Sequence, residues 1–240
     1  MGYYTFNSGL IGTGKITPVD GVHDLIASQV FSEKYPIVSG TGTLFKGSTS
    51  TGSASSGWTT LQSSSKDDGN REVPLGFNWT INSTQYSSVY VGSNNYITFG
   101  SGQNTFSGYN FSTWGIPKIL YTMTSDNSYQ YVTYKQFTDY TRIRFEGNAS
   151  TSGTVGSGNI VWETTFFNPA AVGNISLVEI RCGSNGRGTQ LTMGIAGPSS
   201  TTAYASHNSL VNQSVVYVGN SVGNAYTANV GSYVNYTTGL

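Results

Sequence analysis

The chain has 240 residues and a formal net charge of zero, and only 9% of its residues are charged, against roughly 25% in an average soluble domain. Its 11 basic residues are scattered and matched by 11 acidic ones, which excludes the clustered positive surface that nucleic-acid binding requires. An aromatic content of 13% at zero net charge excludes an intrinsically disordered chain and favours a packed β structure.

Residues 1–66 are predicted to form an arm outside the compact domain. Residues 1–12 lack the basic start, the apolar run and the small-residue cleavage site of a secretory signal. If Met1 is the natural start, we therefore expect synthesis in a cytosol without export by the usual route. The chain also has no run of about 18 apolar residues, the length that spans a bilayer, so we expect no membrane span.

Residues 20–34 are predicted to form a short helix within this arm. Asp20 is a suitable N-terminal cap, and Tyr35-Pro36 sets the end because the residue before a proline disfavours helix. Apolar residues recur close to helical spacing at Val22, Leu25, Ile26 and Val30. Two interpretations stay open: a surface helix that lays this face on the β core, and a docking element for another subunit.

Residues 39–66 are dominated by Gly, Ser and Thr, a composition typical of a flexible linker that becomes ordered by lying along a neighbour. Trp58 makes such ordering credible. We place the start of the compact domain, residues 67–240, at a turn that contains Asp67 and Asp68. These two carboxylates lack the alternating oxygen ligands of a calcium loop, so we expect no metal site there.

The stretch 72–100 has the strongest strand pattern, because its apolar and aromatic residues alternate with polar ones. Asn94 and Asn95 tolerate positive φ and allow the chain to reverse between the second and third runs. We therefore expect three short antiparallel strands joined by tight turns.

This stretch resembles the start of nidogen-like and related extracellular or viral β-sandwich domains, including those of phage virions. The resemblance is carried by Leu75-Gly76-Phe77, Tyr86, Val89-Tyr90-Val91, Asn94-Asn95 and Ile97-Thr98-Phe99. The family pattern has Asn-Gly at the turn where this chain has Asn-Asn, and the resemblance fades towards residue 180. It implies a β-sandwich fold and leaves function open.

Further strands are expected along the rest of the chain, separated by turns rich in Gly, Asn, Asp and Ser. They fall at 116–124, 129–137, 141–146, 159–167, 174–182 and 190–196. Turn signals at spacings of about 8–12 residues predict an all-β antiparallel sandwich of jelly-roll type. The tail 199–240 has apolar runs at 215–218 and 233–236, and we expect it to close sheet edges or pair with a partner chain.

The strands also carry the charged residues that invite a chemical interpretation. Arg142 and Arg144 alternate with apolar residues, which we interpret as a solvated face. Glu146, Glu163 and Glu179 are candidates for the carboxylate pair of a sugar hydrolase, but exposed strand glutamates are commoner than catalytic ones. We therefore expect no enzyme, and no catalytic, cofactor-binding or metal-binding residue.

The hypothesis that best fits these features is a non-enzymatic virion structural protein, such as a phage tail, fibre or capsid-decorating subunit. It explains an extracellular type of composition without a secretory signal, because virion proteins are made in the host cytoplasm. The expected partners are copies of itself and other virion proteins. The alternative is a carbohydrate-binding or adhesive module at a cell surface. Trp58, Tyr109 and Trp114 are the candidate contacts to a partner or a host-surface glycan.

Overall fold

The computed structural model describes most of the chain from residue 34 onward. The described ranges are 34–45, 57–62, 66–106, 110–121, 128–148, 160–185, 192–198, 203–208 and 212–236. The helix predicted over 20–34 lies outside these ranges except for Lys34, and so do residues 46–56 and 63–65 of the predicted linker.

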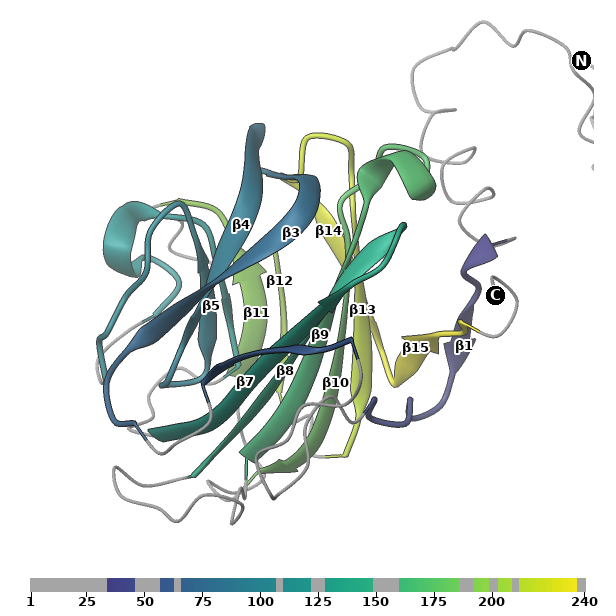
Figure 1. Cartoon of the computed structure of the whole chain (residues 1–240). Helices are drawn as coiled ribbons and strands as arrows, with labels where there is room; N and C mark the ends of the chain where they lie inside the picture. The colour runs from purple at the N-terminus through teal and green to yellow at the C-terminus, as the bar shows by residue number, and fades with distance from the viewer. Residues whose placement is uncertain are drawn as a thin grey trace, which may run out of the picture.

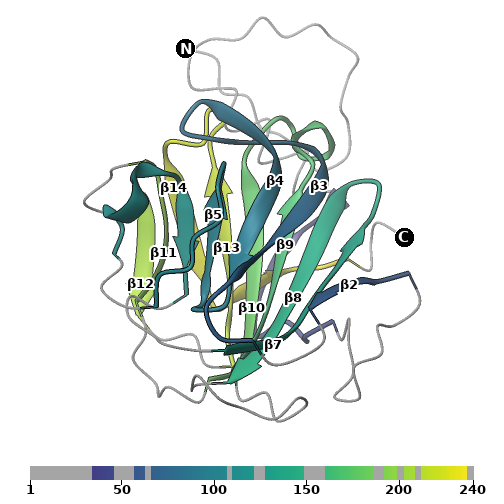
Figure 2. The same cartoon turned by 60° about the vertical axis from the view of Figure 1, so that its left-hand side comes forward.

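Two antiparallel sheets pack face to face, as Figures 1 and 2 show, which confirms the predicted all-β sandwich. The first sheet has seven strands, in the order β14 (Tyr226–Val230), β13 (Ser214–Gly219), β10 (Leu177–Asn185), β9 (Ile160–Phe167), β8 (Tyr140–Asn148), β7 (Ser128–Gln136) and β2 (Thr59–Gln62). The second has six, in the order β12 (Ala205–Asn208), β11 (Thr192–Ala196), β6 (Lys118–Leu120), β5 (Tyr96–Phe99), β4 (Thr84–Gly92) and β3 (Asn70–Ile81). The chain crosses between the sheets after β2, β6, β10 and β12.

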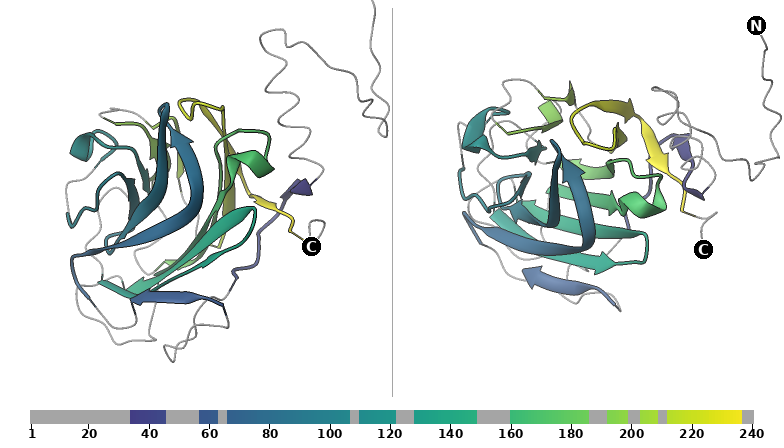
Figure 3. Two further views of the ribbon diagram at one scale, coloured as in Figure 1. Left: turned by 45° about the horizontal axis from the view of Figure 1, so that its top comes forward. Right: turned by 90° about the horizontal axis from the view of Figure 1, so that it is seen from above.

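A third, two-stranded ribbon joins β1 (Ile37–Ser39) to β15 (Ser232–Val234). Figures 1 and 3 show it beside the seven-stranded sheet, on the side away from the six-stranded sheet. Both β1 and β2 come from the segment that we predicted as arm and linker, and β2 pairs with β7. The domain boundary at residue 66 stays a prediction, but the described parts of the arm contribute strands.

The three strands predicted over 72–100 are β3, β4 and β5, and they pair in that order. The β4–β5 turn has Asn95 at φ 62°, as its composition predicted. The β3–β4 turn uses Asn82 and Ser83, both at positive φ, which is the geometry that matches strand twist in a two-residue hairpin. Gly76 at φ 81° lies in a register shift between the two halves of β3, where the strand bends.

The core between the sheets contains an aromatic stack. The ring of Trp162 on β9 lies 4.1 Å from that of Tyr121 and 4.7 Å from that of Phe145 on β8, and it is nearly parallel to both. Its indole N–H donates to Asn95 Oδ1 at 3.3 Å, so the buried polar atom is satisfied. The stacked rings hold the Trp162 indole in place. Its hydrogen bond to Asn95 therefore ties the β4–β5 turn of the six-stranded sheet to the core.

A second apolar cluster lies on the outer face of the seven-stranded sheet, where strands of a simple sandwich would meet solvent. Tyr35, Ile37 and Val234 pack there against Phe167 and Val216. Segments from both ends of the described chain therefore cover this face. Among the described residues, no helix is long and apolar enough to cross a membrane.

Candidate functional site: a covered charged face

The outer face of the seven-stranded sheet also carries charged side chains in two rows that cross β8, β9 and β10. Each row has three residues in direct register, Arg144–Glu163–Arg181 in the first and Arg142–Thr165–Glu179 in the second. Residues directly opposite one another in antiparallel strands point to the same side, and so do residues two apart along a strand. All six side chains therefore share one face, which we call the charged face.

Ion pairs link the charged face internally. Arg144 binds Glu163 at 2.8 Å and approaches Glu146 at 3.8 Å, whereas Arg181 binds Glu179 at 2.9 Å. Burial raises the pKa of Glu163, and the neighbouring Arg144 opposes this rise. Burial likewise raises the pKa of Glu146. Opposite charges on the same strand and on neighbouring strands thus compensate one another where water is excluded.

The prediction that Arg142 and Arg144 form a solvated face is wrong. Their exposed fractions are 5% and 7%, and Glu163 and Glu179 are each 1% exposed. The alternation of charged and apolar residues was identified correctly, but the charged side lies under other parts of the chain. The glutamates that we considered as exposed strand residues are therefore buried in ion pairs.

Residues 41–45, which we call the strap, lie across the charged face. The Phe45 N–H donates to Glu163, and Arg181 donates to the Thr43 carbonyl at 2.6 Å. The Gly42 N–H donates to Ser214 Oγ at 2.9 Å. A Cβ at Gly42 would lie 2.7 Å from Arg181 Nε, so this position requires glycine for close approach.

The ring of Phe45 is inserted between two guanidinium groups. Its centroid lies 3.4 Å from Cζ of Arg142 and 4.0 Å from Cζ of Arg181. Stacking of this kind is a favourable cation–π contact, and it is strongest where water is excluded. Phe45 is therefore the side chain that anchors the strap on the charged face.

Residues 234–236, which we call the C-terminal segment, complete the cover of the charged face. Glu179 accepts hydrogen bonds from the Val234 N–H at 2.8 Å and from the Tyr236 hydroxyl at 2.5 Å. Arg181 donates to the Val234 carbonyl at 2.9 Å. Burial raises the pKa of Tyr236 well above its ordinary value, so its hydroxyl stays protonated and donates. Both strap and C-terminal segment are thus held by directional polar bonds to buried charges.

Of the three residues predicted to contact a partner or a glycan, the two that the structure describes belong to different sheets. Trp58 is half-buried just before β2 of the seven-stranded sheet, whereas Trp114 packs on Tyr96 of the six-stranded sheet with ring centroids 4.8 Å apart. The Trp114 indole N–H donates to Thr105 Oγ1 at 3.1 Å, and its backbone has φ 71°. Tyr109 lies outside the described residues. These contacts stay predictions.

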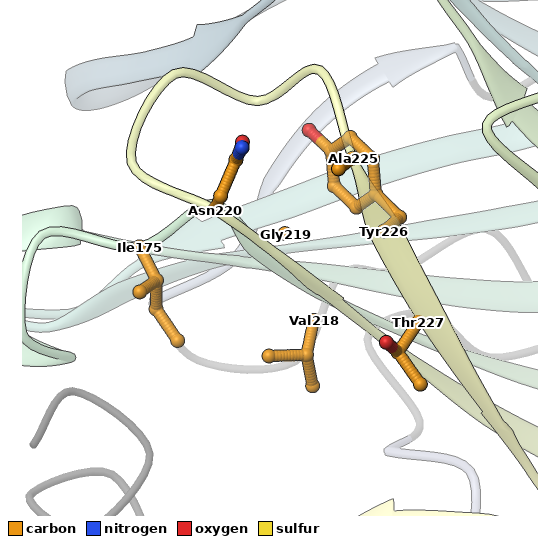
Figure 4. A pocket seen from close by; sticks show the side chains of 7 residues that line it. All are labelled: Ile175, Val218, Gly219, Asn220, Ala225, Tyr226 and Thr227. Atoms are coloured by element: carbon orange, nitrogen blue, oxygen red, sulfur yellow. The ribbon is translucent and has the colours of Figure 1, made fainter. Parts of the chain in front are cut away.

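A pocket of about 280 Å³ opens where β13 and β14 meet (Figure 4). It is lined by Ile175, Val218, Gly219, Asn220, Ala225, Tyr226 and Thr227. The Asn220 amide already donates to Asn224 Oδ1 at 2.9 Å and accepts from the Asn224 N–H at 3.1 Å. Its amide is thus occupied within the loop.

A buried lysine lies on the outer face of the six-stranded sheet. Lys118 is fully buried, in register with Thr98 of β5 and Ala196 of β11, and its Nζ donates to the Phe111 carbonyl at 2.7 Å. Burial lowers the pKa of Lys118 from 10.5 to about 8. One carbonyl acceptor compensates only part of the cost of removing an ammonium from water.

Replacing Lys118 by Met is expected to raise the free energy of unfolding at pH 7 by about 1–3 kcal/mol, because the buried charge is removed. Between pH 8 and 10.5 the unfolded chain binds more protons than the folded one at this site, so the stability of the unchanged protein rises with pH there. The variant lacks this rise. Urea unfolding at several pH values checks the gain at pH 7 and the loss of the rise with pH. Replacement of the exposed Lys66 by Gln is the control. An equal pH dependence of stability in the unchanged protein and in Lys118→Met would refute the lowered pKa of Lys118.

The charged face could be found only in part from sequence. The alternating pattern around Arg142 and Arg144 identified the strand, and Phe45 lies in a stretch that is dominated by Gly, Ser and Thr. Neither feature shows that the two meet, since they lie about 100 positions apart in the chain.

No protein-family model, curated protein or solved structure matches this chain.

Proposed function

We propose that the protein is a non-enzymatic structural subunit of a virion, of the tail, fibre or capsid-decorating kind. The observation that carries the proposal is the anchoring of residues 34–45 on the outer face of the seven-stranded sheet, with the strap bound to the charged face. The strap and β1 fix the course of residues 37–45 along the outer side of the seven-stranded sheet. A fixed segment of this kind suits an assembly subunit that contacts its neighbours through an extended arm.

The buried charges that bind the strap fix its position and contribute little to the free energy of unfolding. Burying several charges costs desolvation, and ion pairs in such places are weak evidence for net stabilisation. They do impose one geometry, because each of Glu163, Glu179 and Arg181 needs its partner in the strap or the C-terminal segment. A particle built from many identical copies depends on such a reproducible geometry in each copy.

The rest of the surface supports the proposal as well. Few charged residues and many Tyr, Ser, Thr and Asn residues suit contacts that repeat between subunits, because charged side chains are depleted in interface cores. Synthesis in the host cytoplasm and partners among copies of itself and other virion proteins follow from this proposal.

The assembly part is tested by light scattering of the full chain over a range of concentrations. We expect a symmetric oligomer, and we expect Phe45→Ala to weaken association at least about tenfold because the arm loses its anchor. Phe106→Ala is the matched control, since that ring is 49% exposed and away from the strap. A full chain that stays monomeric at every concentration would contradict the proposal.

The virion part is tested by mass spectrometry of purified virus particles from the source that encodes the chain. Peptides of the chain should be recovered from intact particles in an amount that matches a repeated subunit. Their absence from particles, with the chain present in infected cells, would contradict a virion role even if the protein forms oligomers.

A further inference from the structure

Among the described strands, β14 lies at one end of the seven-stranded sheet and pairs with β13 alone. None of its five residues is buried, whereas five of the six residues of β13 are buried. The side of β14 away from β13 is therefore a sheet edge that is open to solvent. An open edge presents unpaired backbone groups, and another strand can add to it.

The direction of the backbone groups along β14 follows from the bonds of this strand to β13. The Asn220 N–H donates to the Ala225 carbonyl at 3.1 Å, one residue before β14 begins. In an antiparallel pair every second residue bonds to the neighbouring strand. Tyr226, Ala228 and Val230 therefore direct their N–H and C=O groups away from β13, and no described residue bonds to these groups.

Two other sheet edges are protected against the addition of a strand. β2 has a register shift against β7, where Arg71 of β3 donates to the Leu61 carbonyl at 3.2 Å. β3 contains Pro74 and a register shift against β4, and its Leu75 carbonyl accepts from the Thr141 hydroxyl. Bulges, prolines and charged side chains are the usual protection of edge strands. The fourth edge, β12, lies between residues outside the described ranges.

β14 has none of these protections. It contains no proline and no charged residue, and it pairs with β13 without a register shift. No Asp, Glu, Lys or Arg follows Arg187 in the chain. Identical strands bring identical side chains together, so a charged edge repels its own copy and an uncharged edge does not. Together with the apolar Val230, which is 46% exposed, this favours a second copy of the chain as the partner.

We propose that β14 pairs with β14 of a second copy, antiparallel and about a two-fold axis at Ala228. The outward groups of Tyr226, Ala228 and Val230 are placed symmetrically about this residue. Ala228 then lies opposite Ala228 of the second copy, and Val230 lies opposite Tyr226 of the second copy. Each of the three residue pairs exchanges two hydrogen bonds, and a β-branched residue opposite an aromatic one is a favourable cross-strand pair.

The contact deepens the proposed function and rests on it, since it names a surface through which copies of the subunit meet. Pairing of one short strand buries less surface than the roughly 1,600 Å² of a stable dimer interface. The contact is therefore weak between two isolated copies. In a particle, many such contacts act together with those of the arm, so that each contact can be weak.

Cysteine cross-linking tests the pairing and its register. In a Cys182→Ala background, Ala228→Cys places two thiols opposite each other with Cα atoms about 5.5 Å apart, which a disulfide bridges. Thr227→Cys is the matched control, because its counterpart in the second copy lies diagonally, about 8 Å away. Under mild oxidation Ala228→Cys should give about ten times more disulfide dimer, although Thr227 is the more exposed residue. Equal yields would overturn the proposal.

Proline at residue 228 tests the hydrogen bonds. Ala228→Pro removes an N–H group that points away from β13, so no bond within the chain is lost, and proline is tolerated at such places. Sedimentation velocity should show self-association weakened about tenfold or more, because the two central bonds are lost. Ala228→Ser keeps the N–H group and should associate like the unchanged protein. Equal association of the two variants would overturn the proposal. Where Ala228→Pro does not fold, the cysteine variants decide.

The results distinguish a failure of this contact from a failure of the proposed function. An oligomer that persists in Ala228→Pro and forms no disulfide through Ala228→Cys would overturn the β14 contact and leave the virion role in place. Disulfide dimers of Ala228→Cys, from a chain that is absent from virus particles, would overturn the virion role and leave the contact in place.

Discussion

Replacing Glu163 by Ala is expected to lower the free energy of unfolding by about 3–5 kcal/mol. Glu163 is 1% exposed, binds Arg144 at 2.8 Å and accepts the Phe45 N–H. Its removal leaves a buried guanidinium without its carboxylate and detaches the end of the strap. Removal of one partner from a buried pair is costly for this reason, although the pair itself contributes little net stability.

Urea unfolding followed by circular dichroism measures this loss. Glu72→Ala is the control, since the Glu72 carboxylate is exposed and accepts from Ser88 Oγ at 2.7 Å, and a change within about 0.5 kcal/mol is expected. The paired variant Glu163→Leu with Arg144→Met removes both charges and should recover most of the loss. A single variant that loses less than about 1 kcal/mol would show that the charged face is solvated after all.

Trp162→Ala is expected to cost a similar amount, about 3–5 kcal/mol, because it empties the centre of the core. The side chain is 2% exposed and lies between the rings of Tyr121 and Phe145. Its loss also leaves Asn95 Oδ1 without its indole donor. The β4–β5 turn should therefore loosen together with the core.

Chemical unfolding gives the free energy, and near-ultraviolet circular dichroism reports the loss of the aromatic stack. Trp162→Phe keeps a ring between Tyr121 and Phe145 and should cost only about 1–2 kcal/mol, since a smaller cavity forms. A loss below about 1 kcal/mol for Trp162→Ala would contradict the central place of this stack.

Local patterns were sufficient where one side of a strand is apolar. The alternation over 72–100 and the runs later assigned to β7, β8, β9 and β10 gave the strands to within a few residues. Period-two alternation reports the pleat directly, and Asn95 marked a turn through its tolerance of positive φ. The fold class followed from these strands and their turns.

Short strands in polar segments were not predicted. β2, β12 and β14 have four or five residues each and contain Ser, Thr, Asn and Ala rather than long apolar runs, and β1 has only three residues. Such segments become strands through pairing with neighbours that are distant in sequence, as β2 does with β7. Their local composition does not contain that information.

The charged face shows the same limit at the level of function. A strand with Arg residues on one side has the same sequence pattern whether that side is exposed to water or covered by another segment of the chain. Phe45 is about 100 positions from Arg142, and only the tertiary structure brings the ring onto the guanidinium. The pattern therefore gave the correct face of the strand and the wrong environment for it.

The β1–β15 ribbon has a mechanical consequence. It is antiparallel, with Ile37 opposite Val234 and Ser39 opposite Ser232, so the chain enters β1 and leaves β15 at the same end. Tension between the two ends of the protein therefore acts on the hydrogen bonds of the ribbon one pair after another, beginning at one end. It does not act on all of them at once in shear. The ribbon is therefore expected to open from its Ile37–Val234 end, where Val234 is also bonded to Glu179 and Arg181 of the seven-stranded sheet.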